Sequence, residues 1–454
     1  MPVRSDFYGQ RDRRSLQFGL NEDFFERPVH ISIGPQCAAS RAGQSAALAL
    51  LNMAARLHRS IVVESPGTPL QSPALNGGSR FDDAAHNLLR AVDPFLGSGS
   101  PRARVGASVG LGEDARRGLD WYVGAVGGVA FLAREPVPFE PLPSPSLAGS
   151  FAACLGAMAL CRRLLEDQLM RPDQIDVWRW GRADVSSAGS PRARLDVGDV
   201  LVVGAGGVGS CFAYWASEFG HQGRWAVADG DNAELHNTNR CMGIFPADAG
   251  WPDPPGVNKA VLAARLLDAT PIPKFYHDLS EAEARADLVL PLANEHEVRR
   301  LIGQRGDPIL LHATTSPSWE AQLHRHIPDS DGCIVCRMPP SGPRPTFRCS
   351  EVPVSAESSA AGASTDAALP FLSGAAGLML VRGLLLLQHG ELSDTPSNMH
   401  SLRMKDARGL TGRSRFPCDA SCDRTLLPAV RALVQRGRRW AEVDVKASRS
   451  AARV

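Results

Sequence analysis

VLVVGAGGVGS, residues 200–210, is a glycine-rich turn between an apolar run and a helical pattern. The helical pattern, VGSCFAYWASEFG, is followed by a second apolar run, RWAVAD. This order predicts a βαβ unit with a nucleotide site at its first turn. Gly204, Gly206, Gly207 and Gly209 allow a tight turn, and the helix N-terminus offers free N–H groups to phosphates. A purely structural glycine turn is the alternative interpretation.

The loop after this unit, ADGDNAELHNTNR from residue 228, is rich in polar groups. Asp229 ends the second strand, where such a unit places the acid that holds a ribose. Dinucleotide binding does not explain the other polar side chains, which are Asp231, Asn237, Arg240 and, at the start of the next amphipathic helix, Lys259. They offer cations and an amide to phosphate oxygens and a carboxylate to Mg²⁺, which suits a triphosphate under attack. Loop capping and a solvated lysine are the alternative interpretation.

The motifs GAGGVG, DGDNAELHNTNR and GVNKA together resemble the adenylation domain of the ubiquitin-activating enzyme family, which includes bacterial ThiF and HesA proteins and molybdopterin-synthase adenylyltransferase. The resemblance implies that the C-terminal glycine carboxylate of a small β-grasp protein attacks the α-phosphate of ATP. The products are an acyl-adenylate and pyrophosphate. It also implies that Asp229 holds the ribose and that Asn237, Arg240 and Lys259 contact the phosphates.

One block departs from the family pattern. The family has D-x-V-x-x-x-x-D-N after a buried strand, and its second Asp supports Mg²⁺. The corresponding run here, ADLVLPLANEHEVR, keeps Asp287 and the strand but has Asn294 at the magnesium position. An amide oxygen still coordinates a hard cation, with less charge, and Glu295 or Glu297 lies close in sequence. We expect ATP and Mg²⁺ to bind, with Asp231 carrying more of the metal than elsewhere in the family.

The chain contains an internal repeat. Residues 28–64 follow the strand–turn–helix–strand order of residues 198–229, and residues 146–165 resemble 368–387 in length and small-residue content. We therefore predict an α/β fold of two tandem Rossmann-like adenylation domains that form an internal pseudo-dimer. The predicted parts are residues 1–180 for a first domain with an N-terminal arm, 181–196 for a linker, and 197–445 for a second domain. Two unrelated α/β domains are the alternative.

The first copy lacks the residues that the chemistry needs. Its turn, GPQCAAS from residue 34, has one glycine where the second copy has four, so its backbone cannot approach a pyrophosphate closely. Glu64 ends its second strand, and no Asn–Arg cluster follows. We therefore predict an inactive first domain and an active second domain. The resemblance implies that an arginine of the N-terminal arm (Arg11, Arg13 or Arg14) could reach the ATP, with a solvated basic arm as the alternative.

Two cysteine pairs have metal-binding spacing: Cys333-x₂-Cys336 in GCIVCRMPP and Cys418-x₃-Cys422 in FPCDASC. Such pairs predict a tetrahedral Cys₄ zinc site. Because all four ligands are protein groups, the Zn²⁺ is expected to be structural. The family resemblance also implies a zinc at this point of the chain. Four unrelated thiols are the alternative.

Cys349, in RPTFRCSEVPVSAESSAAGAS, lies after the first pair and before a Pro-, Ser- and Gly-rich stretch typical of a mobile loop. Family members that form a thioester carry their cysteine in this region, so the resemblance implies that role for Cys349. Arg344 and Arg348 beside it would favour the thiolate. An ordinary loop cysteine is the alternative. Five other cysteines are interpreted as packing residues: Cys37, Cys154, Cys161, Cys211 and Cys241.

Composition excludes several classes of protein. The 49 Lys and Arg balance 48 Asp and Glu, so the net charge of +1 favours neither nucleic acid nor an anionic membrane as a partner. MPVRSDFYGQRDRRS lacks the apolar core of a secretory signal. The apolar window 369–387 contains Arg382 and several glycines, which predicts a buried helix rather than a membrane span. Ten cysteines without a signal indicate the reducing cytosol, so a cytoplasmic location is expected.

The predicted function is ATP-dependent activation of a ubiquitin-like protein with a C-terminal glycine, by adenylation and then thioester formation. The Ala- and Arg-rich composition indicates a bacterial genome. In that setting the fused pair of domains implies a ubiquitin-like conjugation pathway of the antiphage-defence type, such as the Bil system, with a ubiquitin-conjugating-type enzyme as a second partner. The alternatives are a sulfur-carrier or peptide adenylyltransferase without conjugation, an NAD-dependent oxidoreductase, and a non-catalytic scaffold.

Overall fold

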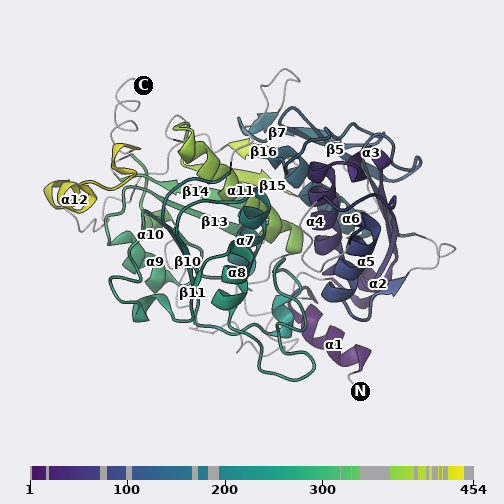
Figure 1. The fold of residues 1–454 in the computed structure, drawn as a ribbon, viewed down its shortest axis with the longest axis horizontal. Helices are drawn as coiled ribbons and strands as arrows, with labels where there is room; N and C mark the ends of the chain where they lie inside the picture. The colour runs from purple at the N-terminus through teal and green to yellow at the C-terminus, as the bar shows by residue number, and fades with distance from the viewer. Residues whose placement is uncertain are drawn as a thin grey trace.

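The computed structural model describes most of the chain. The described residues are 3–16, 20–71, 79–98, 105–165, 172–182, 194–316, 318–328, 330–337, 369–392, 397–404, 408–411, 418, 422 and 428–443. They form two α/β halves that lie side by side, the first in purple and blue and the second in green and yellow (Figure 1).

Each half contains one eight-stranded sheet. The first sheet consists of β1 (Val29–Ile33), β2 (Ser60–Glu64), β3 (Gly97–Ser98), β4 (Ala107–Leu111), β5 (Trp121–Val126), β6 (Val129–Ala133), β7 (Asp173–Asp176) and β8 (Gly181–Arg182). The second consists of β9 (Val200–Val203), β10 (Trp225–Ala228), β11 (Thr270–Ile272), β12 (Leu288–Pro291), β13 (Leu310–Ser316), β14 (Glu320–His326), β15 (Met399–Arg403) and β16 (Arg408–Thr411).

The two sheets have the same topology. The first runs β3-β2-β1-β4-β5-β6-β7-β8, and the second runs β11-β10-β9-β12-β13-β14-β15-β16. In both, the first four pairings are parallel and the last three are antiparallel. Eight strands in one order with one pattern of directions, found twice, indicate a duplicated unit rather than two unrelated domains.

The described helices follow the same division. The first half has α1 (Arg4–Arg11), η1 (Asp12–Arg14), α2 (Glu22–Glu26), α3 (Pro35–Ala38), α4 (Arg41–Ala55), α5 (Phe81–Val92) and α6 (Leu147–Leu165). The second half has α7 (Gly207–Phe219), η3 (Leu235–Asn237), α8 (Lys259–Leu267), η4 (Tyr276–Asp278), α9 (His296–Gly303), α10 (Ile334–Arg337), α11 (Pro370–Gln388) and α12 (Pro428–Gln435).

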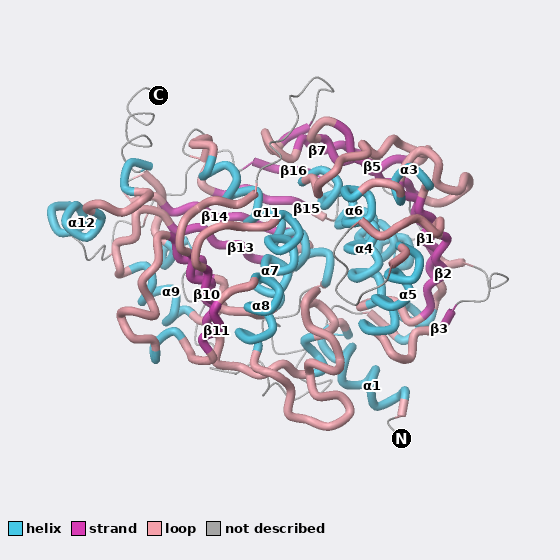
Figure 2. Tube along the Cα trace, viewed as in Figure 1, coloured by secondary structure: helices cyan, strands magenta, loops and turns pink. Residues whose placement is uncertain are grey.

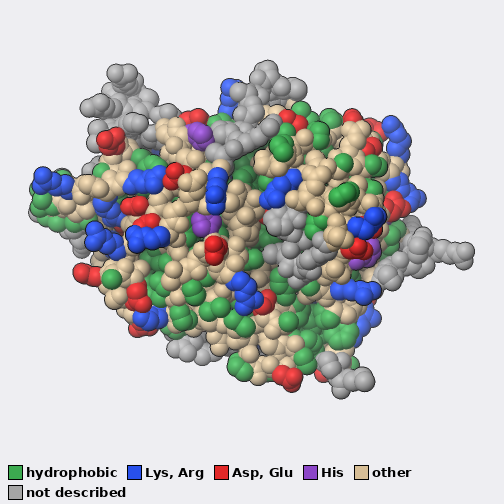
Figure 3. Space-filling view, viewed as in Figure 1, with side chains coloured by type: hydrophobic (Ala, Val, Ile, Leu, Met, Phe, Trp, Pro, Cys, Tyr) green, Lys and Arg blue, Asp and Glu red, His purple; other side chains and the backbone are tan. Residues whose placement is uncertain are grey.

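The core lies between the two sheets. Helices α4 and α6 of the first half pack on α7 and α11 of the second, and the strands lie on either side of them (Figure 2). α6 and α11 are long and apolar enough to cross a membrane by composition, but 89% and 100% of their apolar windows are buried inside the protein. The prediction that residues 369–387 form a buried helix is therefore confirmed. Basic and acidic side chains are interspersed over the face drawn in Figure 3.

The structure confirms the predicted fold class. The two apolar stretches that resemble each other in sequence are α6 and α11, which occupy equivalent places before the last strands of their sheets. Gly181 and Arg182, which the sequence placed in the linker, instead form β8 of the first sheet. The predicted domain boundaries themselves stay a prediction.

Candidate active site

The glycine-rich turn joins β9 to α7 at the carboxyl end of the second sheet. Gly204 has a φ of 98°, and a Cβ there would lie 2.6 Å from the backbone N of Ala293. A Cβ on Gly209 would lie 2.1 Å from the carbonyl oxygen of Gly204, so both glycines are needed by the turn itself. A Cβ on Gly206 would meet open space, and that position leaves room for a ligand.

Asp229 follows β10 and connects the loop to this turn. Its Oδ2 accepts the N–H of Ala205 at 2.7 Å, and its Oδ1 accepts the N–H of Asp231 at 2.9 Å. Burial of the carboxyl group raises its pKa, although the charge of Lys259 acts in the opposite direction. Asp229 therefore lies where the sequence placed the ribose acid, and that role stays a prediction.

Lys259 is the first residue of α8 and lies beside Asp231. Asn258 caps the helix, since its Oδ1 accepts the N–H of Ala260 at 2.9 Å. Its Nδ2 donates to the carbonyl oxygens of Asp229 at 3.1 Å and Asp231 at 3.0 Å, which ties the helix start to the loop. The Nζ of Lys259 lies 2.9 Å from Oδ2 of Asp231, with the lysine side chain only 6% exposed. The alternative of a solvated lysine is therefore wrong.

The 3₁₀ helix η3 and the arginine after it form the rest of the loop. Asn237 is buried, and its Oδ1 accepts the N–H of Glu234 at 2.8 Å, so its side chain caps the loop. The Nη1 of Arg240 donates to the carbonyl oxygen of His236 at 2.9 Å. Its Cδ is 3.5 Å from the point that a Cβ on Gly207 would occupy. Arg240 therefore stands beside the N-terminus of α7, where a phosphate would bind.

The structure distinguishes the two glutamates near the predicted magnesium position. Asn294 is exposed after β12. Burial raises the pKa of Glu295, and the charges of Asp231 and Asp229 raise it further, so Glu295 lies within electrostatic reach of both aspartates. Glu297 instead pairs with an arginine one turn along α9, at 2.5 Å, on its exposed side. Of these two glutamates, Glu295 is the one whose charge interacts with those of Asp231 and Asp229, and a role for it in holding a metal stays a prediction.

The N-terminal arm brings Arg13 to the loop. Arg11 is fully buried and pairs with Asp93 at 2.7 Å, so it belongs to the core of the first half. The Nη2 of Arg13 lies 2.8 Å from Nδ1 of His236 in η3. Burial chiefly, with the charge of nearby Arg14 among the smaller causes, lowers the pKa of His236 to about 3. Arg13 thus contacts the site loop directly.

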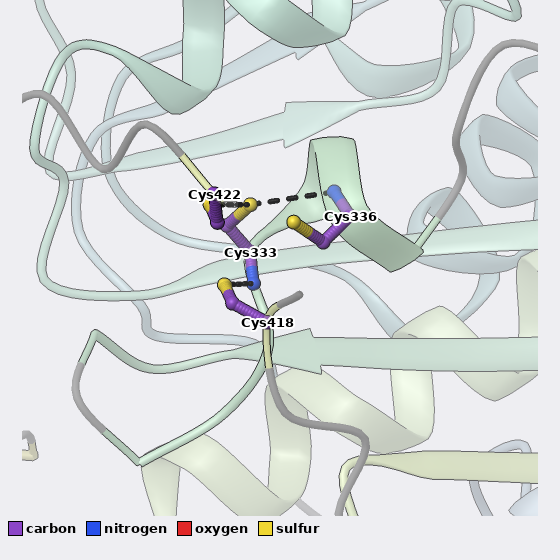
Figure 4. A group of neighbouring side chains, drawn as sticks. All are labelled: Cys333, Cys336, Cys418 and Cys422. Carbon is purple, nitrogen blue, oxygen red and sulfur yellow. Dashed lines mark hydrogen bonds between the residues drawn. The ribbon is translucent and has the colours of Figure 1, made fainter. Parts of the chain in front are cut away.

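The four paired cysteines converge. The Sγ atoms of Cys333, Cys336, Cys418 and Cys422 all lie within 4.8 Å of one another (Figure 4). The Sγ of Cys418 accepts the N–H of Cys333 at 3.1 Å, and the Sγ of Cys333 accepts the N–H of Cys336 at 3.3 Å. Four thiol ligands at this separation fit a tetrahedral Zn²⁺, which would join the segment after β14 to the C-terminal part of the chain.

The remaining cysteines divide into two groups. Cys349 lies outside the described residues. The other five are buried, as expected for packing residues: Cys37, Cys154, Cys161, Cys211 and Cys241.

At the corresponding edge of the first sheet, a carboxylate lies beside the turn after β1. The Oδ2 of Asp114 accepts the N–H of Gln36, near the start of α3, at 2.7 Å, and its Oδ1 would lie 2.0 Å from a Cβ on Gly34. Arg116 donates to Glu64 at 2.7 Å, beside an open cavity of about 490 Å³. A carboxylate therefore accepts a backbone N–H at the start of α3, in the place where the second copy offers free N–H groups to an anion. The inactivity of the first copy stays a prediction.

Two residues of the first half that contact the site loop were missed from the sequence. Asn52 and Arg56 hydrogen-bond to backbone carbonyls between residues 238 and 244. The only signal available was their spacing, since two polar residues four apart in an otherwise apolar helix lie on one face and need a partner. Nothing in the sequence showed that the partner lies in the other half.

Comparison with protein families gives two matches. Residues 180–417 match the ThiF family model, and residues 28–171 match the BilD N-terminal domain. The chain therefore belongs to the ThiF family and is of the ThiF adenylyltransferase type. A comparison with curated proteins gave no match.

Solved structures similar to this one include Escherichia coli MccB with ATP, at 13% identity and a TM-score of 0.39, covering 67% of this chain and 97% of that one. E. coli MccB with AMPCPP and MccA is similar at 12% identity and a TM-score of 0.38, covering 65% and 96%.

Proposed function

We propose that this protein activates the C-terminal carboxylate of a ubiquitin-like protein with ATP. Membership of the ThiF family supports adenylation, and the match of residues 28–171 to the BilD N-terminal domain supports a bacterial ubiquitin-like pathway. The observation that carries the proposal is the buried Lys259 paired with Asp231 beside the glycine-rich turn. Dinucleotide binding needs neither group, whereas a reacting triphosphate needs a cation there.

In the proposed reaction, one oxygen of the carrier's carboxylate attacks the α-phosphorus of ATP. As this P–O bond forms, the bond from the α-phosphorus to the bridging oxygen breaks, and its electron pair leaves with pyrophosphate. Negative charge grows on the leaving group. Lys259, Arg240 and Arg13 would stabilise that charge because they are cations already held around the turn.

Other residues would hold the nucleotide in place. Asp229 would bind the ribose, and the N–H groups from Gly206 to Gly209 at the start of α7 would bind phosphate oxygens. Asn237 would contact the phosphates while its own oxygen keeps the loop capped. These roles place the adenosine at one end of the turn and the reacting phosphate beside Arg240.

The oxygen ligands of the site also fit Mg²⁺. Asp231 and Glu295, with the amide oxygen of Asn294, would hold the ion. Burial is the main cause of the raised pKa of Glu295, and the charges of Asp231 and Asp229 add to it; a cation bound between these carboxylates would offset their repulsion. When bound, Mg²⁺ neutralises phosphate charge and orients the triphosphate.

A second step would transfer the carrier to Cys349. Its thiolate would attack the acyl carbon, a thioester would form, and AMP would leave with the electron pair of the broken C–O bond. A ubiquitin-conjugating-type enzyme would then accept the carrier from Cys349. The cytoplasmic location and the antiphage-defence setting are part of the same proposal.

ATP–pyrophosphate exchange tests the first step. We expect exchange that depends on a β-grasp carrier protein with a C-terminal glycine, and a carrier lacking that glycine is the control. Exchange at background with every candidate carrier would contradict adenylation.

The second step has its own readout. Wild type is expected to form a carrier adduct that thiol reductants remove, and Cys349→Ala is expected not to form it. Carrier-dependent exchange without any adduct would instead indicate an adenylyltransferase that does not take part in conjugation.

A further inference from the structure

Arg56 is a cation of the first half whose guanidinium group contacts the second. It follows α4 and is fully buried. Its Nη2 donates to the carbonyl oxygen of Met242 at 2.8 Å. Its Nη1 donates to the carbonyl oxygens of Thr238 and Ile244, the latter at 3.0 Å. One side chain therefore collects three carbonyls from a single loop of the other half.

Asn52, one helical turn earlier, completes the contact. Its Oδ1 accepts the Nε–H of Arg56 at 2.8 Å, and its Nδ2 donates to the carbonyl oxygen of Met242 at 3.1 Å. The guanidinium carbon also lies 5.7 Å from the ring centroid of Phe245. In the described part of the chain, all hydrogen-bond partners of the Arg56 guanidinium group are thus neutral oxygens.

Burying the Arg56 guanidinium group in the core costs free energy. A buried cation without a counter-ion loses hydration that carbonyl dipoles replace only in part, and an apolar side chain of the same volume would cost less. Burial lowers the pKa of Arg56 to about 10, so the group still carries its charge at neutral pH. Stability alone is therefore a poor explanation for a charge at this position.

The loop that Arg56 holds is the site loop. Thr238 directly follows Asn237, and Met242 and Ile244 lie two and four residues beyond Arg240. Fixing the carbonyls on both sides of Arg240 fixes the path of the backbone from which its side chain extends. The first half thereby helps to fix the backbone from which the Arg240 side chain extends.

We propose that Arg56, supported by Asn52, is a positioning residue for nucleotide activation. It acts from the inactive copy and holds the segment 238–244 so that Arg240 faces the phosphates beside α7. The inference rests on the proposed adenylation function. It gives the inactive copy a part in the reaction at the active copy's site.

Arg382 provides a matched control. It is also fully buried, also crosses between the halves, and also donates to backbone carbonyls: those of Val177 at 2.5 Å and Trp178 at 2.6 Å. Its Nη1 lies 2.8 Å from Nδ1 of His400 on β15. Arg382 lies on α11, and its partners lie directly after β7 and on β15, outside the segment 238–244. Arg382→Met therefore removes an equivalent buried cation without touching the segment 238–244.

The experiment compares the full-length variants Arg56→Met, Arg56→Lys and Arg382→Met with wild type. Each is measured for melting temperature, for kcat and KM for ATP in carrier-dependent pyrophosphate exchange, and for hydrogen–deuterium exchange of residues 236–245. We expect Arg56→Met to lower kcat/KM by about 30- to 100-fold, the effect of misplacing a phosphate-binding group by about 1 Å. Arg56→Lys should recover part of that loss, because it keeps the charge and some of the donors.

Arg382→Met decides between positioning and general stability. We expect its kcat/KM to stay within about threefold of wild type at a comparable loss of melting temperature, since the phosphate contacts are intact. Equal losses in the two methionine variants, or wild-type kcat/KM in Arg56→Met, would overturn the inference.

Hydrogen–deuterium exchange tests the positioning role of Arg56 even if the protein does not adenylate a carrier. If wild type shows no pyrophosphate exchange, adenylation fails, but the loop can still be compared between variants. Faster deuteration of residues 236–245 in Arg56→Met than in Arg382→Met would support the positioning contact. Equal deuteration in the two variants would overturn it.

Discussion

The turn after β1 and the turn after β9 occupy the same place in two sheets of identical strand order, yet different groups lie beside the helix that follows each turn. Near the second turn, Lys259 and Arg240 bring cations to the N-terminus of α7. At the first, the carboxylate of Asp114 accepts the N–H of Gln36 and fills that position. The fold needs the strands and their helices, whereas only the proposed chemistry needs the cations, so the two copies can share one sheet topology and differ at this edge.

The largest difference between the copies is the cysteine cluster after β14. Removing Zn²⁺ with a chelator should lower the free energy of unfolding by about 4 kcal/mol, the value for a ligand that binds only the native state at a thousandfold its dissociation constant. Cys333→Ser should behave like the chelated protein, whereas Cys161→Ala in the first copy should keep its metal. Thermal melts with metal analysis test this. A protein that melts at one temperature with and without metal would contradict a structural zinc.

The charge pairs at the carboxyl edges of the two sheets should differ in how much they contribute to kcat/KM. Lys259→Met should lower kcat/KM for adenylation by about 10²-fold, because it removes a fixed cation from the leaving group. Arg116→Met removes an exposed partner of Glu64 in the first copy and should change kcat/KM by less than about twofold. Pyrophosphate exchange compares them. Similar losses in both variants would show that the first edge also takes part.

Each copy has a glycine near the start of its first long helix with no room for a Cβ: Gly43 in α4 and Gly209 in α7. Substituting each one separates the effect on packing from the effect on ATP binding. A Cβ on Gly209 would lie 2.1 Å from the carbonyl oxygen of Gly204, and one on Gly43 would lie 1.9 Å from that of Cys37. Either glycine-to-alanine change should cost about 2 kcal/mol of stability through overpacking. Only Gly209→Ala should also weaken ATP binding beyond its effect on melting, as calorimetric titration would show. Equal loss of ATP affinity in Gly43→Ala would break the assignment of the nucleotide to one copy.

The smallest expected effect tests how deeply the first site is lost. Asp114→Ala removes a side chain that accepts a backbone N–H at the start of α3 and should cost about 1 kcal/mol. Because the first turn still has a single glycine, the variant should bind one ATP per chain, as wild type should. Equilibrium dialysis gives the stoichiometry. Two ATP molecules per chain would mean that Asp114 alone keeps the first site closed.

Sequence reasoning found the residues whose role depends on local chemistry. Gly204 and Asp229 belong to one βαβ unit, and Lys259 begins a helix with a recognisable cap, so short-range spacing was enough. The repeat was visible because α6 and α11 each need a long stripe of small apolar residues to pack between sheets. Fold class and the location of the candidate site could both be predicted for this reason.

Residues that act through distant contacts could not be found in this way. Arg56 meets Thr238 and Met242 across separations of 182 and 186 residues, and Arg13 meets His236 across 223. Glu295 and Glu297 were indistinguishable in sequence, because the direction of each side chain depends on where α9 begins. Three-dimensional packing decides such choices, and a single sequence contains no record of it.

Because both halves belong to one chain, the contacts between them persist when the protein is dilute. In an assembly of separate subunits, contacts such as that between Arg56 and the 238–244 segment would be lost whenever the subunits dissociated. Here the covalent connection keeps the supporting half at a high effective concentration, whatever the abundance of the protein in the cell. The contact between Arg56 and the segment 238–244 therefore does not depend on the concentration of the protein.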